Sequence, residues 1–147
     1  MSIQSRLKED VKSAMKSGDK QKVGTLRLLL AQMKNRTIQK GTDLTEDDEL
    51  SVLMNAVKQR KEAIELYEKG NRQDLRDKEM QELEVISSYL PRQLSDEEMI
   101  AIVDDVIQKV GAVSIKDLGK VMSTVMKEVR GKADGKKVQA LVRAKLA

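Results

Sequence analysis

Apolar residues recur at spacings of three and four along the whole chain of 147 residues. In the first segment, for example, Ile3, Leu7 and Val11 would share one face of a helix. This period is typical of α-helices with one buried side, and no segment shows the strict alternation of a half-buried strand. The pattern therefore predicts an all-α fold.

Capping signals divide the pattern into seven predicted helices. Thr45 precedes a run of four acidic residues, Ser95 and Glu98 form a capping box, and glycines at 41, 70 and 111 end helices. The expected helices cover about 2–16, 20–40, 46–69 and 73–89, then 96–110, one opened by Ser114, and one after Asp134.

The boundary between two subdomains is predicted at Pro91, the only proline. Proline disfavours the helical conformation of the residue before it, here Leu90. Charge also changes at this point: residues 92–113 carry a net charge of −3, and residues 114–147 carry +6. We predict an N-terminal four-helix domain, 1–91, and a C-terminal three-helix domain, 92–147.

Several kinds of catalytic and metal-binding chemistry are excluded, because the sequence lacks the side chains that they require. Cysteine and histidine are absent, so disulfides, thiol or imidazole catalysis and the usual zinc sites are excluded. We predict no catalytic residue, no metal ligand and no cofactor, and interpret the acidic runs 46–49 and 96–98 as first turns of helices. Phe and Trp are absent too, so an aromatic platform for stacking bases is not expected. Lacking an apolar signal core or a membrane-spanning run, the chain is expected in the cytoplasm without membrane contact.

The strongest candidate site is a basic turn near the C-terminus, which comprises Arg130-Gly131-Lys132-Ala133-Asp134-Gly135-Lys136-Lys137. Asp134 is placed as the N-cap of the last helix, so Lys136 and Lys137 lie beside its positive end, where cations are disfavoured. Ammonium groups and unpaired backbone N–H groups together could bind a phosphate. The alternative is an ordinary solvated face. The predicted nucleic-acid-binding residues are Lys120, Lys127, Arg130, Lys132, Lys136 and Lys137.

Other residues are weaker candidates. Basic side chains on residues 27–61 could extend a phosphate-binding surface, although decoration of amphipathic helices explains them as well. They are Arg27, Lys34, Arg36, Lys40, Arg60 and Lys61, with Gln59 beside them. Gly119, within a predicted helix, could permit a close helix contact or leave room for a ligand backbone. Tyr67 and Tyr89 are interpreted as packing residues with one polar end.

Three motifs in order along the chain carry a family resemblance. The first is Lys58-Gln59-Arg60-Lys61-Glu62-Ala63 with Gly70-Asn71-Arg72-Gln73-Asp74-Leu75; the second is Tyr89-Leu90-Pro91-Arg92-Gln93-Leu94-Ser95-Asp96-Glu97-Glu98. The third is Gly119-Lys120-Val121-Met122 with Val129-Arg130-Gly131-Lys132-Ala133-Asp134-Gly135 and the apolar positions Val138, Leu141, Val142 and Leu146. Together they resemble the YqeY family of small bacterial proteins, and the third resembles the tail domain of the B subunit of tRNA-dependent amidotransferases (GatB).

The resemblance implies a non-catalytic accessory protein that binds tRNA or another structured RNA. In the amidotransferase the tail domain helps to hold tRNA while other domains transfer the amide group. Those catalytic parts have no counterpart in this sequence, so no catalytic activity of the chain alone is expected. One alternative is a protein–protein adaptor that contacts a translation or amidotransferase component. Another is participation in carbon–nitrogen ligase activity, with glutamine as amide donor, within a larger assembly.

Overall fold

The computed structural model describes residues 2–147, and these residues form helices and turns without a β-strand. The predicted all-α fold is confirmed. The chain divides into two compact units, which we call unit 1 (Met1–Pro91) and unit 2 (Arg92–Ala147). The assignment of 1–91 and 92–147 as two separate domains stays a prediction.

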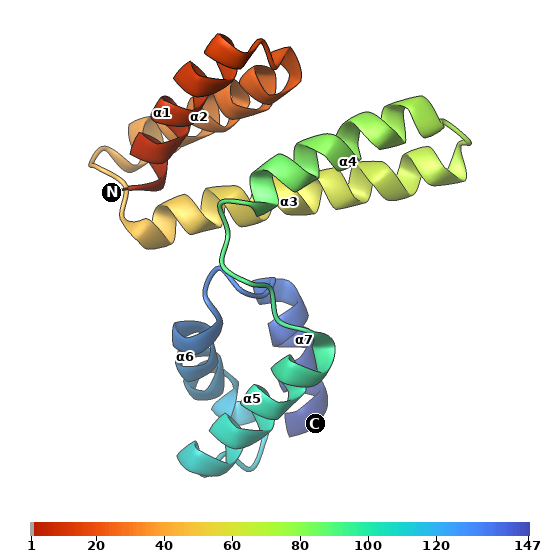
Figure 1. Cartoon of the computed structure of the whole chain (residues 1–147). Coiled ribbons are helices and arrows are strands. Elements are labelled where there is room, and N and C mark those ends of the chain that lie inside the picture. The colour runs from red at the N-terminus through yellow and green to blue at the C-terminus, as the bar shows by residue number, and fades with distance from the viewer. Residues whose placement is uncertain (1) are drawn as a thin grey trace. The chain divides into compact units, whose positions relative to one another are not determined.

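Unit 1 contains two helical hairpins, visible in Figure 1 as the red-to-orange and the yellow-to-green pairs. Its helices are α1 (Ile3–Ser17), α2 (Lys20–Lys40), α3 (Glu46–Lys69) and α4 (Gln73–Ser87). A single apolar core joins them because each helix buries its periodic face. The fully buried members include Leu7, Leu26, Leu29, Met33, Leu53 and Ile86.

The start of α3 supports a neighbouring helix as well as its own. Asp48 and Thr45 form the predicted capping box. Glu49 is only 3% exposed, and its Oε2 accepts a 2.7 Å hydrogen bond from the backbone N–H of Gln4 in the first turn of α1. The acidic run was expected to serve α3 alone. Glu49 departs from this because it caps α1 across the core.

The part of the α3–α4 hairpin that contains residues 61–85 is less buried than the sequence pattern predicted. Between residues 61 and 85 no described residue is fully buried, and Met80, expected inside, is 43% exposed. Only two helices form this part, so one side of each helix lacks a third layer to cover it. Helix α4 also ends at Ser87, two residues before the predicted end at Tyr89.

Tyr89 fastens the end of unit 1 to α1. Its ring is buried, its hydroxyl donates a hydrogen bond to Asp10, and the guanidinium of Arg6 lies 5.1 Å from the ring centroid. Burial and the neighbouring Asp10 carboxylate raise the pKa of the phenol. The interpretation of Tyr89 as a packing residue with a polar end therefore describes its contacts correctly.

Unit 2 consists of α5 (Asp96–Val110), a 3₁₀ turn (Ile115–Asp117), α6 (Leu118–Val129) and α7 (Gly135–Leu146). Its core is built mainly from valines; the fully buried residues include Val103, Val106, Val121, Val125, Val129, Val138 and Val142. The sixth helix was expected to open at Ser114. Ser114 and Asp117 do form a capping box, but it opens the 3₁₀ turn, and α6 itself begins at Leu118. Asp117 Oδ2 accepts the backbone N–H groups of Val113 and Ser114 at 2.9 and 3.3 Å.

Gly119 is exposed in the first turn of α6, and a Cβ built there would meet no atom within 4 Å. Of the two roles considered for Gly119, the close helix contact is therefore absent among the residues that the structure describes. Across residues 2–147, none of the helices combines the length and apolar character that crossing a membrane requires.

Candidate nucleic-acid interface

The connection between α6 and α7 alternates inward and outward residues. Val129, Gly131 and Ala133 are buried, whereas Arg130 and Lys132 are exposed. Gly131 adopts a left-handed conformation with φ of 76°, which a side chain would strain, and the N–H of Lys132 then donates to the carbonyl of Val129 at 2.8 Å. The geometry of the turn thus directs two cationic side chains to solvent.

This turn is fastened to the segment that opens unit 2. The backbone N–H of Leu94 donates to the carbonyl of Lys132 at 2.9 Å, and the side-chain amide of Gln93 donates to the carbonyl of Gly131 at 2.7 Å. Both bonds join residues about forty positions apart in the sequence. They hold the backbone of the basic turn in a fixed place, although its charged side chains point outward.

Helix α7 begins as predicted from the sequence. Asp134 Oδ1 accepts the N–H of Lys136 at 3.1 Å, which makes it the N-cap, and the N–H of Val138 donates to the carbonyl of Asp134 at 3.0 Å. The first turn holds no acid, and Lys136 and Lys137 are both exposed there. Two cations therefore lie at the positive end of a helix dipole, an unfavourable arrangement for stability.

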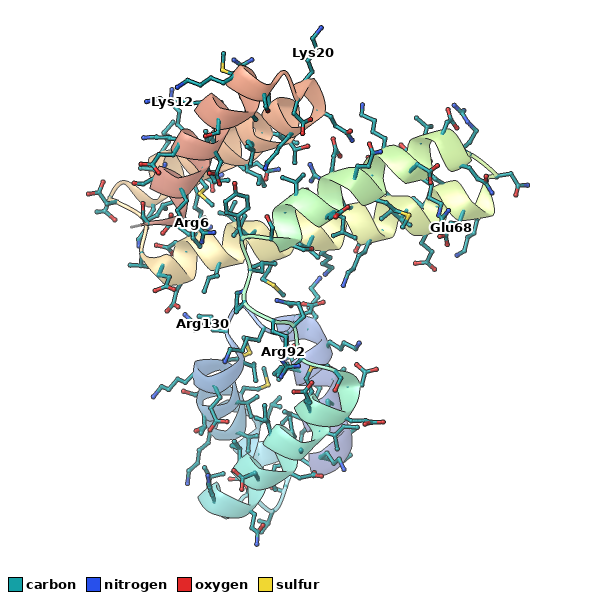
Figure 2. All side chains as sticks on the ribbon, in the orientation of Figure 1. Arg6, Lys12, Lys20, Glu68, Arg92 and Arg130 are labelled. Carbon is teal, nitrogen blue, oxygen red and sulfur yellow. The ribbon has the colours of Figure 1, made fainter. Side chains whose placement is uncertain are left out.

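Four of the six predicted binding residues lie in this turn or in the first turn of α7, and a fifth, Lys127, lies in the last turn of α6. Arg130 is labelled in Figure 2 at the end of α6. Lys120 is separate. It lies seven residues before Lys127, about 10 Å along the helix axis at 1.5 Å per residue. Its ammonium group is 3.4 Å from the carbonyl of Val110 at the end of α5.

An acidic residue, Asp96, lies beside the basic turn, and the sequence pattern did not predict this contact. Lys137 Nζ lies 2.7 Å from Asp96 Oδ1, in the first turn of α5, although both side chains remain more than half exposed. Two antiparallel steps, α5 to α6 and α6 to α7, bring the starts of α5 and α7 to one end of unit 2 (Figure 1). The acidic first turn of α5 was recognised, but its position beside the basic turn depends on this topology.

Arg92 and Glu98 form a second ion pair at this end of unit 2. The guanidinium binds both carboxylate oxygens, at 2.9 and 2.6 Å. This pairing, helped by the backbone N–H of Ser95, lowers the pKa of Glu98 to about 2. Glu98 therefore completes the predicted capping box of α5 and is ionised throughout the neutral range.

Arg60, one of the residues that could have extended a phosphate-binding surface or decorated the helix, is buried. This side chain is 8% exposed and lies between α3 and α4, where its Nε is 3.6 Å from Glu82 and 3.9 Å from Glu79. Burial, and then the nearby Glu82 carboxylate, raise the pKa of Glu79. Lys40 is an ion-pair partner of Asp48. Glu79 and Glu82 belong to α4, outside the stretch 27–61 that supplied these basic residues, whereas Asp48 lies within it.

Among the described residues, no group of His, Cys, Asp and Glu side chains is arranged to hold a metal ion. The acidic positions that resemble ligand clusters in the sequence have structural partners here: Asp48 binds Lys40 and the cap of α3, and Glu49 binds the start of α1.

Comparison with known families identifies the chain. The family described as Yqey-like protein matches residues 4–146. The chain belongs to the YqeY family. The resemblance of the three motifs to the YqeY family is thereby confirmed over nearly the whole length.

Similar proteins in fungi carry the name altered inheritance of mitochondria protein 41, mitochondrial. The protein from Vanderwaltozyma polyspora is 36% identical over 120 residues, which cover 76% of this chain and 64% of that protein. The one from Lachancea thermotolerans is 40% identical over 85 residues, covering 57% and 46%. The one from Pyrenophora tritici-repentis is 29% identical over 149 residues, covering 95% and 81%. The chain spans less than two thirds of the length of the first two.

These names contradict the expected cytoplasmic location, because they place the relatives in mitochondria. The expectation rested on the missing apolar signal core, which argues only against secretion. Mitochondrial targeting segments are amphipathic and basic instead of apolar, so that criterion does not detect them.

Proposed function

We propose that this YqeY-family protein binds a structured RNA, with tRNA as the first candidate, through the turn between α6 and α7. One observation carries the proposal: exposed lysines lie at the positive end of α7, where they oppose helix stability. A bound phosphate would reverse that cost, because an anion at a helix N-terminus is attracted by both the dipole and the ammonium groups.

The surroundings of the turn favour contact with a phosphate backbone over reading of bases. Arg130 and Lys132 point outward next to Lys136, and Lys127 precedes them by one turn. The whole chain contains two tyrosines and no other aromatic residue, and Tyr89 is buried in unit 1. Recognition would then rest on charge and on RNA shape. The preference for tRNA comes from the resemblance of this segment to the amidotransferase tail domain.

Because Lys137 is paired with Asp96, the lysines are expected to contribute unequally to RNA binding. Exposed pairs contribute little to stability, so a phosphate can compete with Asp96 for Lys137. Lys132 and Lys136 are then the main contacts, and Lys120 contributes least, because it lies about two turns from Lys127.

The test is a charge reversal, Lys132→Glu, Lys136→Glu and Lys137→Glu together. We expect loss of tRNA binding in a mobility-shift or anisotropy titration, with unchanged or slightly higher helix content because acids suit a helix start. In the parent protein the affinity should fall as salt rises, with a logarithmic slope of about 0.7–0.9 per neutralised phosphate. Lys58→Glu with Lys61→Glu serves as control and should matter much less. If the triple variant binds tRNA as well as the parent does, the adaptor alternative replaces this proposal.

A further inference from the structure

A polar groove lies between α2 and α3 in unit 1. Its volume is about 450 Å³. It is lined by Gln32, Asn35, Arg36, Gln39, Ser51, Val52 and Asn55. Four of these seven side chains are carboxamides. We propose that this groove binds an extended peptide segment that carries a carboxylate.

The carboxamides match a peptide backbone in chemistry. Each offers an N–H₂ donor and a carbonyl acceptor, as does every peptide group, so the two can pair through two hydrogen bonds. Gln32 gives direct support, because its Oε1 is buried and has no hydrogen-bond partner among residues 2–147. An acceptor left unpaired in this way costs free energy, which a ligand N–H would recover once the side-chain amide of Gln32 turns toward the groove.

The spacing of the lining residues matches an extended chain. On α2, Gln32, Asn35 or Arg36, and Gln39 are on one face over seven residues, about 10 Å of helix. On α3, Ser51 and Asn55 are one turn apart and face them. An extended peptide advances about 3.3 Å per residue, so the groove has room for about three residues.

Charge decides between a peptide and a nucleic acid. Among the described residues that line the groove, Arg36 is the only cation, and a guanidinium binds a carboxylate through two parallel hydrogen bonds. An RNA strand carries one phosphate per nucleotide and would require several cations along this length. Val52 in the groove, and Leu28 one turn before Gln32 with 42% exposure, offer apolar contact for a ligand side chain.

The test starts with a displayed library of random peptides selected on the immobilised full chain. Enriched sequences, made as fluorescent synthetic peptides, are titrated against the parent and against Asn35→Ala with Asn55→Ala. Both asparagines are exposed, so the fold should be retained. We expect enrichment of Asp or Glu and about tenfold weaker binding to the double variant, from two lost hydrogen bonds. The matched control is Gln21→Ala with Gln73→Ala, two exposed amides elsewhere in unit 1, which should bind like the parent.

Two further variants complete the design. Arg36→Glu should abolish binding of the acidic peptides, with helix content unchanged. The Lys132, Lys136 and Lys137 triple variant should bind them normally, since this inference is independent of the RNA proposal. The proposal is overturned if no peptide enriches, or if the Asn35 and Asn55 changes leave binding unaltered. It is also overturned if those changes weaken binding of an oligoribonucleotide pool and not of peptides.

Discussion

Two turns of the molecule, one in each unit, have nearly the same local design. Between α1 and α2, Gly18 has φ of 74° and the side chain of Asp19 accepts the N–H of Lys22 at 3.1 Å. Between α6 and α7, Gly131 has φ of 76° and Asp134 accepts the N–H of Lys136 at 3.1 Å. Both helices that follow have lysines and no acid in their first turn.

The difference lies in what precedes each cap. Asp19 follows Gly18 directly, so the first turn of α2 begins at once. Asp134 follows a longer connection in which Arg130 and Lys132 are exposed and the backbone is held by Gln93 and Leu94. Lysines at a helix start are therefore not in themselves a site. We attribute the proposed RNA binding to the fixed turn that adds cations beside them.

The strongest test of this attribution is a pair of matched double reversals. Lys136→Glu with Lys137→Glu should weaken tRNA binding by about tenfold or more at low salt, because two phosphate contacts become repulsive. Lys20→Glu with Lys22→Glu makes the same change at the start of α2 and should leave the affinity within about twofold. Anisotropy titrations at one salt concentration measure both. Equal losses would mean that RNA binds through diffuse positive charge, and the comparison would then fail.

The two caps should contribute similarly to stability even though only the turn between α6 and α7 is proposed to bind RNA. Asp19→Ala and Asp134→Ala each remove a side-chain acceptor at an N-cap, so each should lower the free energy of unfolding by about 1 kcal/mol. Urea denaturation followed by circular dichroism measures the change. Asp→Ser at either position keeps a capping oxygen and should recover most of the loss. A much larger effect at Asp134 alone would show that the fixed turn depends on its cap.

A smaller effect is expected when the charge of the cap is removed but its acceptor is kept. Asp134→Asn leaves an oxygen for the N–H of Lys136 and deletes one negative charge beside the phosphate site. Binding of tRNA should tighten by about two- to fivefold at low salt, since each nearby charge contributes about 1 kcal/mol or less when exposed. Asp19→Asn should produce no change. Tightening by both variants would again indicate binding through overall charge.

The smallest expected effect is on the stability of the fold at low pH. The pKa of Asp48 in unit 1 is lowered to about 2, first by the Lys40 ammonium, and that of Glu98 in unit 2 is lowered to about 2, first by Arg92. A depressed carboxyl pKa stabilises the fold above the unfolded value, near 4, and this contribution is lost as pH falls toward 2. Thermal unfolding between pH 5 and 2 should therefore show declining stability. Asp48→Asn and Glu98→Gln should each flatten that decline; an unchanged slope would contradict the assignment.

Most of the features that were predicted correctly from the sequence depend on residues close together in the chain. The cap at Asp134, the capping boxes at Thr45 and Ser95, and the exposure of Lys136 follow from residues within one helical turn. Contacts between distant segments could not be predicted in the same way. Asp96 reaches Lys137 across 41 positions, and Glu49 caps α1 across 45. Arg60 was assigned to the surface because its amphipathic pattern does not reveal that α4 places Glu79 and Glu82 against it.

The two hydrogen bonds that hold the basic turn also connect it to Gln93 and Leu94. The backbone amide of Leu94 should therefore respond when a ligand binds the turn. Because the amide of Leu94 donates to the carbonyl of Lys132, its proton should exchange with solvent only when that bond opens. An RNA that orders the turn would slow this exchange and shift the amide resonance of Leu94, although Leu94 itself carries no charge. One amide signal, nearly forty residues away along the chain, would thus record occupancy of the turn without a label on the RNA.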